Sequence, residues 1–390
     1  MESSVNVNRR NFLISSLVGA GLLYLAAKYR LSSNHEHHDK ILATAAGTPT
    51  KTTIYQVAPS GANDKIIACH VSTGKIQAIP VPVNGHQISQ HPFDKRLIFT
   101  SEKWGEAAAL VDLKNEKVLQ LIKSEPGTRF FGHSIFSADG KYIICSEIDD
   151  KVGTSFLGVR DYQTLKLINK IPSHGIFAHQ LRSPDNGKTV LVVNSGVFHQ
   201  SYAENAPHWK NSPDLHEDGR FNHIDLESGK LLKSTSLGEA GFAHFAFDHN
   251  DGSSVVIGNA RPIGNPSLIS IVKNDGTVID LRETKAIDYI GEALSVEMDT
   301  KNKVAYVTIP DRNLLLQIDY KNNQLLGHLN LEYVRGLAVD QDRLFTSSIQ
   351  MALAQTTSSK TSMQTWNWQK WNPPGPIYGA HLALLDSYLK

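Results

Sequence analysis

The sequence predicts an all-β fold, a β-propeller of seven four-stranded blades. Three observations lead to this prediction. A short pattern built around a histidine recurs along the chain at nearly constant spacing. The segments between its copies have the composition of short strands separated by turns. The two ends of the chain supply complementary parts of one further blade, so that the ring closes with one C-terminal strand and three N-terminal strands.

The recurring pattern is a small residue, His, any residue and an apolar residue. It occurs with His at positions 86, 133, 179, 244 and 381, and with Leu in place of His at positions 294 and 337. In chain order these seven positions are 47, 46, 65, 50, 43 and 44 residues apart. A period in this range is typical of repeats in which each copy forms one supersecondary unit. Composition alone, with 17 His among 390 residues, predicts fewer than one His in seven positions.

Each repeat contains four short apolar segments, which in the first copy are 86–91, 95–101, 108–113 and 117–122. Turn residues such as Asp139-Gly140 and Asp251-Gly252 separate the segments. Residues 52–82 resemble strands two to four of a blade, and His381 to Leu385 resemble a first strand. Pairing the two removes the exposed edges of an open ring. Six blades remain an alternative, because residues 350–376 are rich in Ser, Thr and Gln and show a weak strand pattern.

The N-terminus has the features of a targeting segment. Arg9-Arg10 precede an apolar run of 16 residues, Phe12 to Ala27. This arrangement is typical of a twin-arginine translocation signal, so we expect a periplasmic protein. The leader is either removed or kept as an inner-membrane anchor, although 16 residues are few for a span. The predicted parts are the leader (1–30), a His-rich linker (31–50) and the propeller (51–390).

The net charge of +1 argues against non-specific nucleic-acid binding, and no nucleic-acid partner is expected. Cys69 and Cys145 fall in strands of different blades, which favours two buried thiols over a disulfide. The linker sequence His35-Glu36-His37-His38-Asp39 offers metal-binding side chains. We interpret it as a solvated segment with incidental metal affinity, because nothing fixes the geometry of its ligands.

The five recurring histidines are the candidate metal ligands. The first strand of each propeller blade lines the central channel, so equivalent positions point towards one axis. Neutral imidazole is the commonest protein ligand for Zn, Cu, Fe and Ni. We therefore predict an arc of imidazoles facing an apolar wall at Leu294 and Leu337. The alternative is structural, with each ring packing against a neighbouring blade. The predicted ligands are His86, His133, His179, His244 and His381.

Further polar side chains are expected on the same face. Glu102 and Glu147 stand at the predicted ends of second strands, and Arg129 and His174 stand in the loops that lead into blades two and three. We predict that these four residues contact a cofactor or ligand, since carboxylates orient imidazoles or act as general bases. Loop capping is the alternative for the two glutamates. An insertion at 197–220 is expected to overhang this face as a lid.

Three segments carry a resemblance to a known family: Phe131 to Gly140, Ser146-Glu147 and Pro172 to Leu181. They resemble the uncharacterised bacterial family known as domain of unknown function 1513. More distantly, the chain is similar to lactonase and YVTN-type propellers and to the quinoprotein amine dehydrogenase β-chain superfamily. The resemblance implies a propeller fold and no established activity. It also implies an envelope setting, with iron- or haem-handling proteins as partners.

Two functional classes follow. The first is an exported binding or accessory protein that holds a transition metal, a non-covalent haem, a small ligand or a partner on its His-lined face. The second is an enzyme, either a metal-dependent redox protein or a lactonase-like hydrolase. The sequence contains no C-x-x-C-H motif, which excludes covalent haem. No constellation of nucleophile, base and oxyanion donors is recognisable, so no catalytic residue is assigned and the binding class is favoured.

Overall fold

The computed structural model describes part of the chain. The described residues are 40–46, 64–150, 153–185, 187–198, 215–259, 266–283, 291–348, 353–358, 363, 368–371 and 381–388. The twin-arginine leader, the linker up to Asp39 and residues 199–214 of the insertion lie outside them. The chain forms two compact units, Met1–Asp39 and Lys40–Lys390, and the described residues all belong to the second unit.

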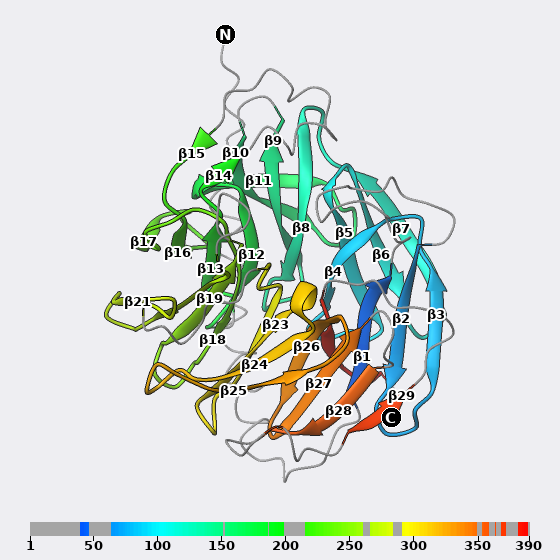
Figure 1. The fold of residues 1–390 in the computed structure, drawn as a ribbon. Helices are drawn as coiled ribbons and strands as arrows, with labels where there is room; N and C mark the ends of the chain where they lie inside the picture. The colour runs from blue at the N-terminus through cyan, green and yellow to red at the C-terminus, as the bar shows by residue number, and fades with distance from the viewer. Residues whose placement is uncertain are drawn as a thin grey trace. The chain divides into compact units, whose positions relative to one another are not determined.

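The second unit is a β-propeller made of antiparallel strands, as the sequence predicts (Figure 1). One turn of 3₁₀-helix, Pro310–Arg312, follows β23 (Val304–Ile309). None of the described residues form a helix long and apolar enough to cross a membrane.

Most strands belong to four-stranded sheets in which consecutive strands pair. Three sheets follow one another in the middle of the chain. Their strands are β12 (Ala178–Arg182), β13 (Thr189–Asn194), β16 (Arg220–Asp225) and β17 (Leu231–Ser236); β18 (Phe242–Phe247), β19 (Ser254–Gly258), β20 (Leu268–Val272) and β21 (Val278–Asp280); and β22 (Ser295–Asp299), β23 (Val304–Ile309), β24 (Leu314–Asp319) and β25 (Gln324–Asn330). A two-stranded ribbon, β14 (Val197–Phe198) and β15 (Leu215–His216), begins and ends the predicted insertion.

One eight-stranded sheet joins two such units, because β5 also pairs with β8 through Lys103 and Phe131. Its strands are β4 (Gly85–Gln90), β5 (Leu97–Gly105), β6 (Ala107–Asp112), β7 (Lys117–Lys123), β8 (Thr128–Phe136), β9 (Tyr142–Asp149), β10 (Thr154–Asp161) and β11 (Leu167–Ile176). The outer strand β7 alternates exposed and half-buried residues, whereas β6 is almost wholly buried. This gradient is typical of a blade whose outer edge faces water.

The weakly patterned region 350–376 does contribute strands. It supplies β28 (Leu353–Thr357) and β29 (Gln369–Trp371), which extend the sheet begun by β26 (Val334–Asp340) and β27 (Arg343–Ser348). The sequence signal was weak here because polar residues such as Gln355 and Thr356 occupy much of β28.

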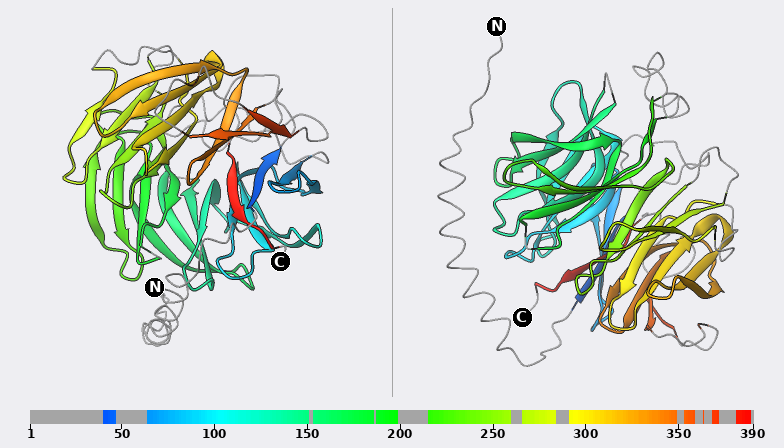
Figure 2. Two further views of the ribbon diagram at one scale, coloured as in Figure 1. Left: turned by 90° about the horizontal axis from the view of Figure 1, so that it is seen from below. Right: turned by 90° about the vertical axis from the view of Figure 1, so that its left-hand side faces the viewer.

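The last sheet combines both ends of the unit. Its strand order is β3 (Ile76–Pro80), β2 (Lys65–His70), β1 (Lys40–Ala46) and β30 (Ala383–Asp386). Figure 2 shows the red C-terminal strand beside the blue β1 in its left view. Strand β1 starts at Lys40, before the predicted start of the propeller at residue 51, and occupies part of the predicted linker. The fully buried Ile41 and Ala43 and the Lys40–Asp386 ion pair of 2.8 Å explain why this segment belongs to the sheet.

Hydrophobic side chains fill the spaces between successive sheets. One cluster joins Val255 and Ile257 of β19 to Val307 of β23, and another joins Ile66 of β2 to Ile98 of β5. This face-to-face packing removes a large apolar area from water and fixes the sheets radially. Cys69 and Cys145 are buried free thiols within this packing, as predicted.

Candidate metal centre

The five recurring histidines come together. His86, His133, His179 and His244 lie in the strands β4, β8, β12 and β18, and His381 lies two residues before β30. One ring nitrogen of each residue lies within 4.8 Å of the corresponding nitrogen of every other. His133, His179 and His244 are buried, and the other two are half-buried. Residues separated by almost the whole chain therefore form one cluster, which we call the His centre.

Two of the distances between ring nitrogens match those of neighbouring ligands around one ion. The Nε2 atom of His86 lies 3.2 Å from Nε2 of His381 and 3.3 Å from Nε2 of His179. A metal–nitrogen bond of about 2.1 Å places neighbouring ligands roughly 3.0 to 3.4 Å apart and opposite ligands about 4.2 Å apart. Without an ion, one nitrogen of His86 would have to serve two imidazoles through a single proton or a single lone pair.

Irregularities in strand pairing orient the imidazole rings of the His centre. The pairing register shifts between Gly85 and Gln87 in β4, and between Ala178 and Leu181 in β12. Comparable shifts occur in β8 between Phe130 and Ser134, and in β18 next to His244. A β-bulge redirects a side chain relative to the regular alternation of a strand. The bulges allow each imidazole to point into the centre while later residues of the same strand pack in the core.

The small residue before His has a steric explanation in β8. Gly132 adopts φ +95°, and a Cβ atom placed on it would lie 2.5 Å from Cδ2 of His86. Any other residue would push the ring of His86 out of place or strain the backbone. The glycine of one repeat thus makes room for the histidine of the preceding repeat.

The residue after His links neighbouring sheets. The Oε1 atom of Gln87 accepts a hydrogen bond of 3.2 Å from the backbone N–H of Ser134, and Oε1 of Gln180 accepts one of 2.6 Å from the N–H of Phe245. Ser134 and Phe245 each directly follow a histidine of the centre. Two His-Gln pairs therefore fix the backbone next to the following histidine. The repeated His-Gln pair is the signal in the sequence from which this link could be predicted.

Burial keeps the imidazoles neutral. Removal from water is the main cause that lowers the pKa of all five rings, and it lowers the pKa of His381 to about 3. Nε2 of His133, Nδ1 of His179 and both nitrogens of His244 are buried without a hydrogen-bond partner among the described residues. Neutral imidazoles with such nitrogens offer lone pairs, and a buried unpaired polar group destabilises a fold unless something binds it.

The charged groups that act on the centre are cations. Lys103, Arg182 and Arg335 each lower the pKa of His381. Arg182 at the end of β12 forms an ion pair of 2.5 Å with Glu297 of β22, although β18 lies between these strands in the chain. The carboxylate of Glu297 therefore neutralises Arg182.

The predicted cofactor contacts lie in strands rather than in loops, and two of them make structural ion pairs. Glu147 is fully buried in β9, where both of its oxygens accept hydrogen bonds of 2.9 Å from Arg160. Arg129 in β8 contacts Asp150 at 2.9 Å. These pairs hold the strand ends, so a ligand contact from either residue would require breaking one. Their predicted role stays a prediction.

Glu102 and His174 also have local partners. Oε2 of Glu102 accepts a hydrogen bond from the backbone N–H of Ala107 at 3.0 Å, and the ring of His174 bonds the carbonyl oxygen of Gly229 at 3.1 Å. Glu102 therefore stabilises the turn after β5, which is the alternative role considered for it. The ligand-binding role of both residues stays a prediction.

The predicted apolar wall packs into the fold. Leu337 belongs to a core cluster with Tyr306 and Leu344, and Leu294 is 6% exposed. Leu337 thus fills space between sheets. The predicted lid residues 199–214 lie outside the described residues.

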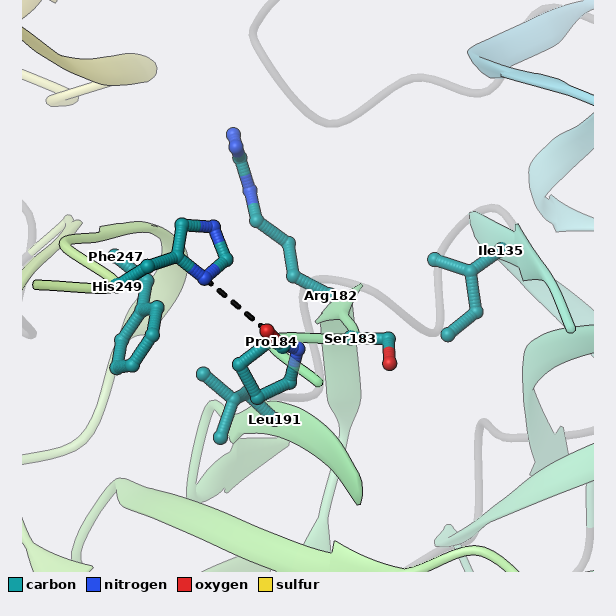
Figure 3. Close-up of a pocket in the computed structure, with 7 residues that line it drawn as sticks. All are labelled: Ile135, Arg182, Ser183, Pro184, Leu191, Phe247 and His249. Atoms are coloured by element: carbon teal, nitrogen blue, oxygen red, sulfur yellow. Dashed lines mark hydrogen bonds between the residues drawn. The ribbon is translucent and has the colours of Figure 1, made fainter. Parts of the chain in front are cut away.

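A separate pocket of about 280 Å³ lies at the end of β12. Figure 3 shows Phe247 and His249 on one side of it and Ile135 on the other, with Arg182 to Pro184 between them. The ring of His249 contacts the carbonyl oxygen of Pro184 at 3.2 Å. None of the five clustered histidines lines this pocket.

Comparison with known proteins places the chain. A family model described as "Protein of unknown function (DUF1513)" matches residues 79–384, the span that contains all five histidines. The chain belongs to this family. No curated protein matches this DUF1513 chain.

Several solved structures share the fold of the DUF1513 chain at low identity. Hydrazine synthase of Kuenenia stuttgartiensis has 11% identity and a TM-score of 0.60, and the match covers 81% of this chain and 100% of that one. A putative 6-phosphogluconolactonase of Bacteroides fragilis has 12% identity and a TM-score of 0.57, with 91% and 100% covered. A functionally unknown protein of Desulfotomaculum acetoxidans has 13% identity and a TM-score of 0.55, with 88% and 98% covered. At this identity the likeness concerns the fold alone.

Proposed function

We propose that this protein is a metal-holding β-propeller in which the His centre binds one first-row transition metal ion. The observation that carries the proposal is the convergence of five imidazole nitrogens within 4.8 Å. The donor set consists of neutral nitrogens without thiolate or carboxylate. Such a set suits copper, nickel, zinc or iron(II) and does not suit magnesium or calcium, which prefer oxygen ligands.

A purely structural role accounts less well for the cluster. Packing histidines normally satisfy their ring nitrogens with neighbouring donors or acceptors. Here His244 has two buried nitrogens without a partner among the described residues, and His133 and His179 have one each. Several unsatisfied groups at one point destabilise the protein unless an ion binds them. The centre is therefore better explained as a binding site than as packing.

The geometry favours an ion over haem. In a haem protein the macrocycle separates the axial ligands and requires a slot wide enough for its plane. The rings of the His centre instead contact one another, with centroids 4.6 Å apart for His133 and His179 and 4.5 Å apart for His244 and His381. Rings packed this closely leave no plane for a porphyrin between them.

The blade count, export and partners belong to the same proposal. The sheets are consistent with seven blades if the eight-stranded sheet is counted as two. The twin-arginine motif at Arg9-Arg10 supports export to the periplasm, and an exported metal-holding protein fits envelope iron- or haem-handling partners. Replacing both arginines with Lys should abolish appearance of the protein in a periplasmic fraction. Unchanged export would rule out the twin-arginine route.

The test is the metal content of the purified full-length chain. All samples carry His35→Ala, His37→Ala and His38→Ala, which remove the metal affinity of the linker. We expect close to one transition metal ion per chain, and at most a trace after His133→Leu combined with His179→Leu. His328→Leu, at an exposed site in β25, serves as the control and should keep the metal. Metal-free protein after purification and after incubation with copper, nickel, zinc and iron(II) would refute the proposal.

A further inference from the structure

The side chain of Arg335 has unused hydrogen-bonding capacity. Its Nε is buried and has no hydrogen-bond partner among the described residues. Its Nη1 lies 3.5 Å from the hydroxyl of Tyr333, and the guanidinium lies 5.5 Å from the centre of the Tyr333 ring. The guanidinium is thus held in place by its stacking partner, while one donor is left for something else. A buried charged donor without an acceptor destabilises a folded protein.

Arg335 lies beside the His centre. Its neighbour Gly336 packs so tightly that a Cβ on it would lie 2.8 Å from the backbone nitrogen of Leu382. Leu382 directly follows His381, so Arg335 and His381 belong to adjoining backbone segments. The charge of Arg335 acts on His381, whose pKa it helps to lower.

A second cation approaches from another sheet. Lys103 in β5 has its Nζ 5.8 Å from the centre of the Phe131 ring, and that ring lies 4.9 Å from the ring of His179. Lys103 lowers the pKa of all five histidines. Lys103 and Arg335 both lower the pKa of His381, and the donor set itself carries no negative charge.

Aromatic side chains border this side of the centre. The ring of Trp104 lies 4.6 Å from Phe131 and 5.4 Å from Phe177, and Trp104 is half-buried. Trp104 and Phe177 have positive φ angles of +66° and +56°, in the left-handed region that residues other than glycine rarely adopt. Such strained positions gather at ligand sites. The bulky rings of Trp104, Phe131 and Phe177 therefore pack against one another next to His179.

We propose that the metal of the His centre takes a small carboxylate as a further ligand, held by Arg335 and Lys103. This inference rests on the proposed function. Five nitrogen donors leave one position of an octahedral ion, and an anion at that position balances the charge of the metal. The planar edge of a guanidinium matches the two oxygens of a carboxylate, and an ammonium group adds a point charge.

The test uses the full-length chain without the three linker histidines, loaded with copper(II) and titrated with sodium formate. Binding is followed by the electron paramagnetic resonance spectrum of the copper. We expect a saturable spectral change in the wild type, and Arg335→Gln should raise the half-saturating formate concentration about tenfold or more at unchanged copper content. Arg335→Lys keeps the positive charge but loses the paired N–H donors of the guanidinium. This variant should have an intermediate half-saturating formate concentration. Lys103→Gln should weaken formate binding less than Arg335→Gln.

Two controls match these variants. Arg343→Gln removes an arginine of the same sheet that pairs with Asp340, and Lys117→Gln removes an exposed lysine of β7. Both should leave formate binding unchanged. Copper that binds normally but ignores formate, or an Arg335→Gln variant with wild-type formate affinity, would overturn this inference alone. A wild-type protein that binds no metal would overturn both proposals. A response to sodium azide without one to formate would also overturn the carboxylate assignment.

Discussion

Nε2 of His86 and Nε2 of His381 lie 3.2 Å apart, although 295 positions separate the two residues in the chain. Their contact depends on the closing sheet, in which β30 pairs with β1. The His centre is therefore complete only when the C-terminal strand has joined the N-terminal strands. Closure of the ring and formation of the site are one structural event.

His244→Leu should separate stability from metal binding. Leu occupies the equivalent position in two other repeats, and the substitution removes two buried nitrogens without partners. We expect the metal-free variant to be more stable than the wild type by about 1–3 kcal/mol, and its metal affinity to be lower. Urea unfolding with a chelator and a metal titration measure the two effects. A metal-free variant less stable than the wild type would argue that His244 is a packing residue.

Gly132→Ala should displace the His86 ring, although Gly132 is not itself a ligand of the His centre. The new Cβ would lie 2.5 Å from the His86 ring at a backbone angle of φ +95°. We expect a loss of about 1–3 kcal/mol in unfolding free energy together with reduced metal content. Gly327→Ala is the control, because a Cβ there meets nothing within 4 Å. Equal metal content in both variants would show that the position of His86 does not matter.

The stability of the metal-free protein should fall as the pH drops from 7.5 to 5. Each histidine of the centre has a folded-state pKa below the ordinary value of 6.5, about 3 in the case of His381. The unfolded chain therefore binds protons first, and stability decreases as the pH falls below 6.5. Asp386, whose pKa lies near 2, acts only at lower pH.

Unfolding free energies at several pH values measure this effect, and His244→Leu should show a shallower dependence than the wild type. A wild-type stability that stays constant or rises towards pH 5 would mean that the rings are not buried in neutral form.

Glu147→Gln tests whether this carboxylate is structural. It leaves Arg160 buried without its charged partner, which typically costs about 3–5 kcal/mol of stability. The folded fraction should keep full metal content, because both carboxylate oxygens of Glu147 bond Arg160. Replacing both residues with Met should restore much of the lost stability. Metal loss in a stably folded Glu147→Gln variant would instead place the carboxylate in the site.

Sequence periodicity predicted the fold and the group of five histidines. This succeeded because a propeller repeats its backbone, so that equal positions in the pattern become equal positions around the channel. The closing strand was predicted from the same logic applied to the incomplete ends. The sequence predicts a propeller start at residue 51, after β1, because β1 lies next to a polar, His-rich segment and has little pattern of its own.

The supporting contacts could not be predicted in this way. The bulges at His86 and His179 depend on pairing between strands. A one-residue shift of the pairing register cannot be recognised from the sequence of either strand alone. Glu147 looked like a ligand residue at a strand end, whereas its partner Arg160 comes from the next strand. The unpaired Nε of Arg335 depends on how the guanidinium packs against Tyr333. Such relationships arise from tertiary structure and are visible only there.

X-ray absorption at the metal edge of the loaded full-length protein, without the three linker histidines, tests the central claim most directly. We predict nitrogen ligands at about 2.1 Å with the outer-shell pattern of at least four imidazoles, at one metal per chain. The pattern should lose imidazole scattering in His244→Leu. A spectrum dominated by oxygen or sulfur ligands, or one unchanged by His244→Leu, would contradict the assignment of the His centre as the metal site.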